Sequence, residues 1–217
     1  MSNLANQNFY FGINDLDSGD YKTGAPFNRE VFTLYTAWRG LDRPSPAPNG
    51  RPLPASAQNQ LRAAIARGEQ IFNNKPFTVS RVAGLNDANR ANSFRATCSS
   101  CHNVPNVGSH ALPRLFNTGV ADANRRSADL PLYTLQNKAT GEQIQTTDPG
   151  LAMQTGRWLD IARFKVPVLR GLEARSPYFH DGSAQNVEDL VKFYNDRFAI
   201  GFSLQEMTDL AEFLKTL

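Results

Sequence analysis

The segment Cys98-Ser-Ser-Cys101-His102 constrains this chain more than any other feature. It contains both cysteines of the 217-residue sequence, and the histidine that follows them is one of three. A C-x-x-C-H pattern is the attachment site of a c-type haem. The two thiols form thioethers with the haem vinyl groups, and the imidazole is then held beneath the iron as its proximal ligand. The segment therefore predicts a covalent haem c bound through Cys98, Cys101 and His102.

Three other uses of a C-x-x-C pair fit the rest of the sequence poorly. A structural zinc site needs four ligands, and only His110 and His180 lie outside the motif. A thioredoxin-like redox pair requires a βαβ context, and residues 85–115 show no such pattern. A disulfide across two intervening residues closes too small a loop to add much stability.

Composition and charge exclude some classes of protein. The hydrophobic content of 41% is ample for a core, and the net charge of +3 is dispersed without a run of Lys or Arg. This pattern speaks against nucleic-acid binding. No apolar stretch approaches the ~20 residues that a membrane span needs, and the N-terminus does not read as a signal peptide. Because haem c is normally attached outside the cytoplasm, we expect an exported, periplasmic protein present here in a mature or trimmed form.

The first quarter of the chain is expected to contribute little regular structure. Residues 1–25 are rich in Asn, Asp and Gly and read as irregular. Residues 28–40 could form a helix capped by Asn28. The stretch 42–56 holds five prolines and reads as an extended, polyproline-like connector. We therefore treat residues 1–55 as an N-terminal extension with a Pro-rich connector.

Two segments with helical spacing enclose the rest of the chain, residues 56–217. The first begins at Ser56, a suitable N-cap, and continues with apolar residues three and four apart. Gly68 within it costs about 1 kcal/mol relative to Ala, which suggests a close crossing by another helix. The second segment runs to the C-terminus, and Ser203 with Glu206 forms a capping box at its start. We expect these two helices to cross at Gly68.

Between the two helices the sequence shows little regular structure. Residues 103–117 are interrupted by two prolines and a glycine, and residues 118–150 are polar and turn-rich. A hairpin is expected within residues 133–147, with its turn at Asn137–Gly141. A haem can organise such loops, because its flat apolar surface supplies a packing surface that the sequence itself lacks.

Three blocks in the last third of the chain carry a family resemblance: KVPVLR at 165–170, PYFHDG at 177–182 and VEDLVKFYN at 187–195. Together with CSSCHNVPNVG at 98–108, they closely resemble the C-terminal haem domain of bacterial dihaem cytochrome c peroxidases and their MauG-like relatives. The resemblance covers roughly residues 60–217. It implies a mostly α fold, namely a class I cytochrome c-like helical haem domain with long loops, here preceded by the irregular N-terminal extension.

One departure from the family pattern bears on activity. Its members carry two haems on two domains, whereas this chain has a single C-x-x-C-H. In the dihaem enzymes the N-terminal haem reacts with peroxide, and the C-terminal haem stores and relays electrons. The matching domain here is the C-terminal one, so peroxidase activity does not carry over by itself. Two interpretations of the chain therefore stay open: it is a monohaem relative of the family, or it is a piece or subunit of a larger assembly.

The resemblance also implies a second iron ligand. The family's distal ligand lies on the helix after the PYFHDG block, as Met in the peroxidases and Tyr in MauG-like proteins, and the matching position is Tyr194. An apolar stripe on residues 187–198 turns this tyrosine inward. The alternative is a core tyrosine with its hydroxyl hydrogen-bonded nearby. Met153, in a loop where class I cytochromes present a Met ligand, is the other candidate, or packs against the core as a loop residue.

Further residues are candidates for haem contacts. His180 is a candidate catalytic, proton-handling or cofactor-contacting group, or else a turn histidine bonded to the backbone. Arg170 could pair with a haem propionate, or lie at the surface. His110 is expected to hydrogen-bond a propionate or its own loop. Trp38 and Trp158 are electron-relay candidates by family analogy, or apolar anchors.

The sequence supports two hypotheses from different classes. The first is a periplasmic electron-transfer protein with one haem and a redox partner protein. The alternative is a peroxidase-like or MauG-like enzyme that reacts with hydrogen peroxide. Because Glu173 is poorly placed to assist His180 and Tyr194 would close the distal face, we expect electron transfer. A haem subunit that docks to a second haem domain or subunit is a third reading. The dihaem enzymes hold calcium between their domains near the block matching Ser176, but we do not expect calcium here.

Overall fold

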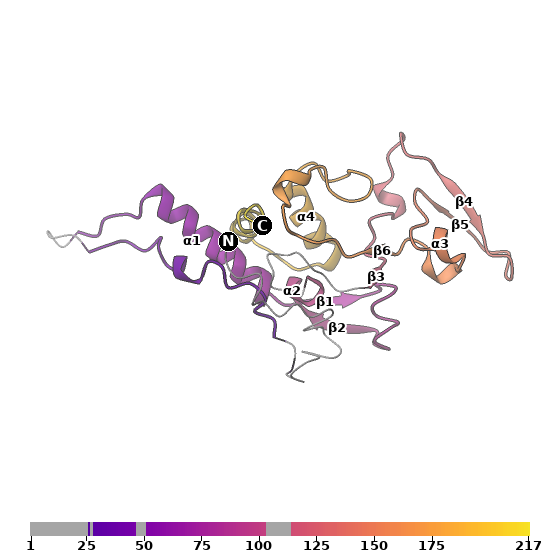
Figure 1. Ribbon diagram of the computed structural model, residues 1–217, viewed down its shortest axis with the longest axis horizontal. Coiled ribbons are helices and arrows are strands. Elements are labelled where there is room, and N and C mark those ends of the chain that lie inside the picture. The colour runs from indigo at the N-terminus through magenta and orange to yellow at the C-terminus, as the bar shows by residue number, and fades with distance from the viewer. Residues whose placement is uncertain (1–25, 27, 47–50, 103–113) are drawn as a thin grey trace, which may run out of the picture.

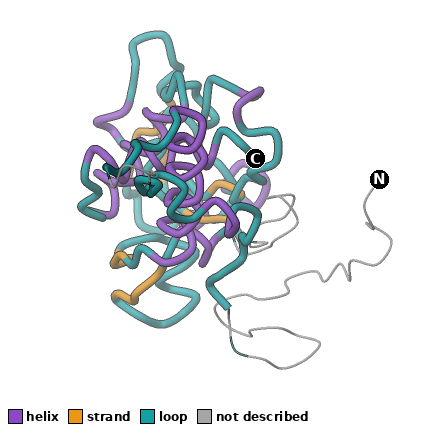
Figure 2. The backbone as a smooth tube through the Cα atoms, turned by 90° about the vertical axis from the view of Figure 1, so that its left-hand side faces the viewer, coloured by secondary structure: helices purple, strands orange, loops and turns teal. Residues whose placement is uncertain are grey.

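The computed structural model describes residues 26, 28–46, 51–102 and 114–217. Short elements in it are joined by long loops (Figure 2). The helices are α1 (Ala57–Asn74), α2 (Cys98–Cys101), α3 (Ala152–Thr155), α4 (Val187–Phe198) and α5 (Leu204–Leu214), and the 3-10 turns are η2 (Thr36–Trp38), η3 (Ala123–Arg125), η4 (Trp158–Asp160) and η5 (Glu173–Arg175). The strands are β1 (Phe77–Ser80), β2 (Ser93–Ala96), β3 (Leu115–Phe116), β4 (Tyr133–Gln136), β5 (Gln143–Thr146) and β6 (Phe164–Lys165). They form three antiparallel pairs, β1–β2, β3–β6 and β4–β5.

Helices α1 and α5 cross at Gly68, as the sequence predicts. A Cβ placed on Gly68 would lie 2.0 Å from the carbonyl oxygen of Asp209 and 2.6 Å from the Cβ of Phe213. Figure 1 shows α5 lying across α1. An ion pair reinforces the crossing, since Arg67 donates from Nε and Nη2 to the two carboxylate oxygens of Asp209 at 2.7 and 3.0 Å.

The predicted helix caps are confirmed. Ser56 accepts a hydrogen bond from the backbone N–H of Asn59 at 3.2 Å, and Ser203 and Glu206 form the reciprocal capping box of α5. At the start of α4, the side chain of Asn186 accepts from the N–H of Asp189 at 2.8 Å. Caps such as these satisfy backbone donors that have no partner inside the helix.

The segment 28–40 is not a helix, and the expectation of one was wrong. Only the 3-10 turn η2 forms in it, because backbone groups of this segment bond to buried side chains of α1. Asn73 accepts from the N–H of Phe32 at 3.3 Å and donates to its carbonyl at 2.7 Å. Glu69 accepts from the N–H of Tyr35 at 3.0 Å. The segment is thereby fastened to the helical core.

The Pro-rich connector turns back instead of extending. Ser45 and Leu53 exchange two backbone hydrogen bonds of 2.9 Å as an isolated antiparallel bridge. Prolines on either side restrict the backbone without preventing this reversal. Val31 and Phe32, which precede the connector in the chain, are buried in the same hydrophobic cluster as residues of α1 and α5. Part of the N-terminal extension therefore packs into the same core as α1 and α5.

The β4–β5 hairpin is confirmed, with Leu135 opposite Ile144 and a turn in which the N–H of Gly141 donates to the carbonyl of Asn137 at 2.8 Å. It lies at the end of the molecule opposite α1 (Figure 1). The β1–β2 ribbon was not expected from the sequence. In the described ranges of the chain, no helix is long and apolar enough to cross a membrane.

Candidate haem site

The C-x-x-C-H segment forms a single helical turn locked by its own serines. Thr97 and Ser100 make a capping box at the start of α2, and the N–H of Thr97 donates to the hydroxyl of Ser100 at 2.9 Å. The hydroxyl of Ser99 donates to the carbonyl of Asn73 at the end of α1. Both serines are buried. The residues between the cysteines thus hold Cys98 and Cys101 one turn apart against α1.

The three motif side chains are uncharged and strongly desolvated. Cys98 and Cys101 are free thiols, and desolvation raises the pKa of each thiol to about 12. Desolvation also lowers the pKa of His102 to about 4. The imidazole is therefore neutral at physiological pH, which is the form that binds a metal. The backbone carbonyl of Pro167 acts in the opposite direction and raises the pKa of His102, but by less than desolvation lowers it. Nδ1 of His102 is buried and has no partner of normal hydrogen-bond geometry among the described groups.

The motif lies where two hydrophobic clusters meet. The helical cluster includes Phe32, Phe72, Val187, Val191, Leu210 and Phe213, and the ribbon cluster comprises Phe77, Val79, Val82, Leu85, Ala96, Phe116 and Val166. Cys98 and Ile200 pack against both clusters, and Cys101 packs against the second. A large flat apolar cofactor attached here would be covered on both sides, because apolar surface is available from each cluster.

Tyr194 lies near the cysteines. Desolvation raises the pKa of its phenol, and the thiols of Cys101 and Cys98 raise the pKa further because their thiolates would repel a phenolate. In the part of the chain that the structure describes, the hydroxyl of Tyr194 makes no hydrogen bond. By contrast, the hydroxyl of the buried Tyr178 donates to the Leu172 carbonyl at 3.1 Å. Among the described residues, Tyr194 therefore lacks the hydrogen-bond partner that a core tyrosine normally has.

Sequence reasoning missed Arg125, which lies among the aromatic rings beside Tyr194. Its guanidinium is 4.3 Å from the ring centroid of Phe193 and 5.4 Å from that of Phe179, and the Phe193 and Tyr194 centroids are 5.1 Å apart. Arg125 donates to Ser183 at 2.6 Å, but its buried Nε has no partner among the described groups. A cation with unused donors next to the site suits a haem propionate. No sequence motif marks Arg125, and only its position in the structure identifies it as a candidate.

His180 is held away from the aromatic rings around Tyr194. Its ring stacks on Phe164 at 4.4 Å and 15°, and its Nε2 lies 3.7 Å from Oδ2 of Asp148. The preceding residue, Phe179, contacts Tyr194 instead, with ring centroids 6.2 Å apart. The PYFHDG turn therefore directs the phenylalanine, and not the histidine, towards the candidate ligand.

The other sequence candidates lie at the surface or outside the described residues. The side chain of Met153 on α3 is 74% exposed, so it is not among the groups that surround the cysteines. Arg170 is also exposed. His110 lies outside the described residues. Across the described ranges, no group of three or more His, Cys, Asp or Glu side chains could hold a metal ion.

Comparison with known proteins bears on this cofactor. No family model and no solved structure matches the chain. The chain is 29% identical over 145 residues to the cytochrome-c peroxidase IdrP1 of Denitromonas iodatirespirans, 33% identical over 122 residues to the cytochrome c551 peroxidase of Nitrosomonas europaea, and 31% identical over 121 residues to the cytochrome-c peroxidase IdrP2 of Pseudomonas sp. strain SCT. These matches cover 58%, 55% and 52% of this chain.

The similarity supports the cytochrome c peroxidase family. It implies a c-type haem cofactor, in agreement with the C-x-x-C-H turn. The matched regions cover 38%, 30% and 32% of the three relatives, so the chain spans about a third of their length. The desolvated thiols, the neutral His102 and the nearby Tyr194 fit the haem.

Proposed function

We propose that the chain carries one haem c, attached to Cys98 and Cys101, with His102 as proximal and Tyr194 as distal ligand, and that it transfers electrons in the periplasm. The observation that carries the proposal is the position of Tyr194, whose phenol lies near the two thiols and has no hydrogen-bond partner among the described residues. When bound, the haem supplies reversible one-electron exchange at its iron. A class I cytochrome c-like arrangement, with α1 and α5 crossing beside α2, is part of this proposal.

The protein groups prepare the ligands for this role. His102 needs no deprotonation, because desolvation already keeps its imidazole neutral. A small rotation would let Nδ1 donate to the Pro167 carbonyl, which would orient the ring as outer-shell partners of metal-binding histidines do. Desolvation keeps the phenol of Tyr194 protonated in the absence of iron, and a bound cation would favour the phenolate. Phenolate ligation stabilises ferric iron and lowers the reduction potential.

Electron transfer is preferred to peroxide cleavage because the acid–base groups of the described residues do not converge on this site. His180 is the nearest candidate along the family motif, and it is held by Phe164 and Asp148. Peroxide cleavage needs a proton-transfer group within hydrogen-bond reach of the reacting oxygen. Within the described ranges, the ionisable groups close to Tyr194 are the two thiols, and Arg125 lies beside the adjoining rings.

A second candidate function is favoured by the relatives, which are named cytochrome c peroxidases. In that case the chain reacts with hydrogen peroxide itself, or serves as the haem unit of a larger peroxidase. Because the chain spans about a third of the relatives' length, docking to a second haem domain or subunit would complete such an assembly.

Ligand-binding spectra distinguish the two functions. For the electron-transfer role, the ferrous protein should not bind carbon monoxide and the ferric protein should not react with hydrogen peroxide. The Tyr194→Phe variant should gain both reactions, because it vacates a coordination position. Tyr178→Phe is the matched control and should behave as the wild type. Rapid carbon monoxide binding and a peroxide reaction in the wild type would make the protein an enzyme.

A further inference from the structure

A continuous series of aromatic side chains links His102 to the N-terminal segment. The ring centroid of Phe72 lies 6.2 Å from that of His102, and Phe213 lies 5.6 Å from Phe72. Tyr35 follows at 6.2 Å from Phe213, and Trp38 stacks on Tyr35 at 4.6 Å and 30°. The series joins α2, α1 and α5 to a segment that precedes all three helices in the chain.

The inner and outer ends of the series differ in character. Phe72 and Phe213 are buried, whereas Tyr35 and Trp38 are partly exposed. Tryptophan and tyrosine are the side chains most easily oxidised by one electron, and they occupy the outer positions. Electron tunnelling weakens steeply with distance, so rings in close succession provide a better path than loosely packed chain. The series therefore ends at the surface in its most redox-active residue.

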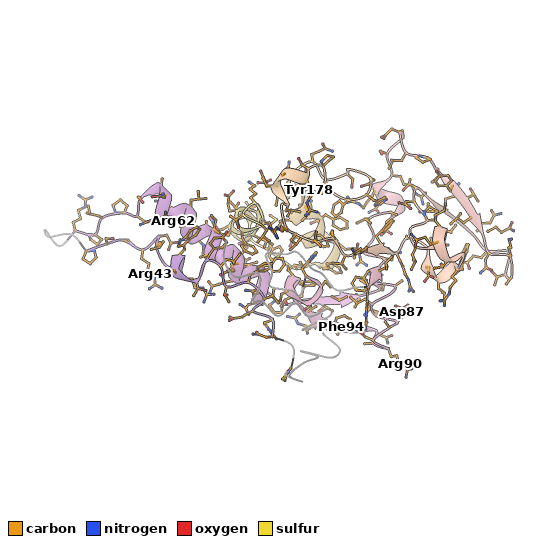
Figure 3. All side chains as sticks on the ribbon, viewed as in Figure 1. Arg43, Arg62, Asp87, Arg90, Phe94 and Tyr178 are labelled. Carbon is orange, nitrogen blue, oxygen red and sulfur yellow. The ribbon has the colours of Figure 1, made fainter. Side chains whose placement is uncertain are left out.

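Two arginines lie at the outer end. The guanidinium of Arg62 lies 5.5 Å from the ring centroid of Trp38, and the side chain of Arg43 packs against the turn at Gly40. Figure 3 shows Arg43 and Arg62 at the same end of the molecule. Within the described ranges, neither arginine forms an ion pair with a carboxylate.

The neighbouring arginines are neutralised, which sets these two apart. Arg67 contacts Asp42 at 2.5 Å and Asp209 at 2.7 Å. Arg39 lies 3.9 Å from the buried Glu69. Among the described residues, Arg39 and Arg67 therefore pair with the carboxylates of Asp42, Glu69 and Asp209, and Arg43 and Arg62 remain as positive charges.

We propose that Trp38, Arg43 and Arg62 form the docking site of an acidic redox protein, and that electrons pass between this partner and the haem along Trp38, Tyr35, Phe213 and Phe72. The inference rests on the proposed electron-transfer function. Positive charge steers an acidic partner towards the site and speeds its association. Tryptophan and arginine are also the residues that most often anchor protein interfaces.

Anchoring of the N-terminal segment alone would explain the buried rings but not the outer end. A packing role is satisfied by any large apolar side chain and gains nothing from two guanidinium groups that pair with no carboxylate of the described residues. The combination of an oxidisable ring, positive charge and a close-packed connection to the proximal histidine is what a redox docking site requires.

A redox-inert anion tests the docking site without any electron transfer. We would add hexacyanochromate(III), a paramagnetic trianion, to the ¹⁵N-labelled holoprotein and follow the two indole N–H resonances by NMR. The resonance of Trp38 should broaden, and that of Trp158 should not. Trp158 lies on η4, which contacts α3, and α3 lies at the end of the molecule opposite α1 (Figure 1). Equal broadening of the two, or none at Trp38, would overturn the proposal.

A kinetic measurement tests the path. In stopped flow, one electron passes from the ferrous protein to one hexacyanoferrate(III) ion, which becomes hexacyanoferrate(II). The double variant Arg43→Gln/Arg62→Gln should slow this reaction about tenfold through lost electrostatic attraction, and Trp38→Phe should slow it several-fold. The matched controls Arg157→Gln and Trp158→Phe should leave the rate unchanged.

The outcomes distinguish failure of the docking site from failure of the proposed electron-transfer function. If the wild type reacts and the Trp38 and arginine variants react equally fast, electrons leave by another route and the docking proposal is wrong. If the wild type holds no covalent haem or does not exchange electrons, the proposed function itself fails, and the docking site fails with it.

Discussion

Gly68 of α1 meets Asp209 of α5 so closely that a Cβ at Gly68 would lie 2.0 Å from the Asp209 carbonyl oxygen. The oxygen belongs to a helix backbone and cannot move alone. The crossing therefore depends on the missing side chain, and it fixes how α5 lies against the helix that carries Phe72.

Substitution of Gly68 tests this dependence. Gly68→Ala should lower the free energy of unfolding by about 3 kcal/mol or more, because overpacking outweighs the better helix propensity of alanine. Ala64→Gly in the same helix is the control and should cost about 1 kcal/mol. Denaturant unfolding followed by circular dichroism measures both. A stabilised Gly68→Ala variant would show that the two helices are not held this close.

The crossing could be predicted because it follows from local rules. A glycine inside a helical pattern is costly and needs a reason, and the caps at Ser56, Asn186 and Ser203 are read from residue types at fixed spacing. The β4–β5 hairpin likewise follows from a turn signal between two strands.

The segments that were predicted wrongly depend on distant partners. Residues 28–40 contain no signal that Glu69 and Asn73, buried on α1, accept their backbone N–H groups. The return of the connector depends on the pairing of Ser45 with Leu53, and prolines alone do not reveal it. The position of Arg125 among aromatic rings is also tertiary, since η3 is distant in sequence from α4.

The capping box of α5 makes stability depend on pH. Glu206 accepts from Lys75 Nζ at 2.7 Å and from the Ser203 N–H at 2.8 Å, and these bonds lower its pKa. A carboxylate with a lowered folded-state pKa stabilises the fold above its unfolded-state pKa, and this contribution is lost as pH falls through the folded-state pKa. Glu206→Gln should therefore cost roughly 0.5–1 kcal/mol at neutral pH.

The pH dependence separates the charge from the cap. The difference between Glu206→Gln and wild type should be present at neutral pH and should shrink as pH falls through the lowered folded-state pKa of Glu206. Ser203→Ala removes an uncharged acceptor and should cost about 1 kcal/mol both at neutral pH and at a pH below this pKa. Unfolding in urea at the two pH values gives these differences, and a constant penalty for Glu206→Gln would contradict the electrostatic explanation.

Arg125 is expected to tune the haem. Removal of its charge in Arg125→Gln should lower the reduction potential, because a nearby cation disfavours the more positive ferric state. The lost contact with Phe193 should also reduce the free energy of unfolding by about 1 kcal/mol. Arg126, whose guanidinium donates to the Gln145 carbonyl, provides the control variant Arg126→Gln. Spectroelectrochemical titration measures the potentials, and an equal shift in both variants would refute a specific role for Arg125.

In the proposed site, one covalent haem would be held by His102 and Tyr194 as its two iron ligands. The most direct measurement is resonance Raman spectroscopy of the ferric protein, with excitation in the phenolate-to-iron charge-transfer band. We predict tyrosinate modes that persist in Tyr178→Phe and disappear in Tyr194→Phe. Tyrosinate modes that survive in Tyr194→Phe, or a wild-type protein with none, would show that Tyr194 is not an iron ligand.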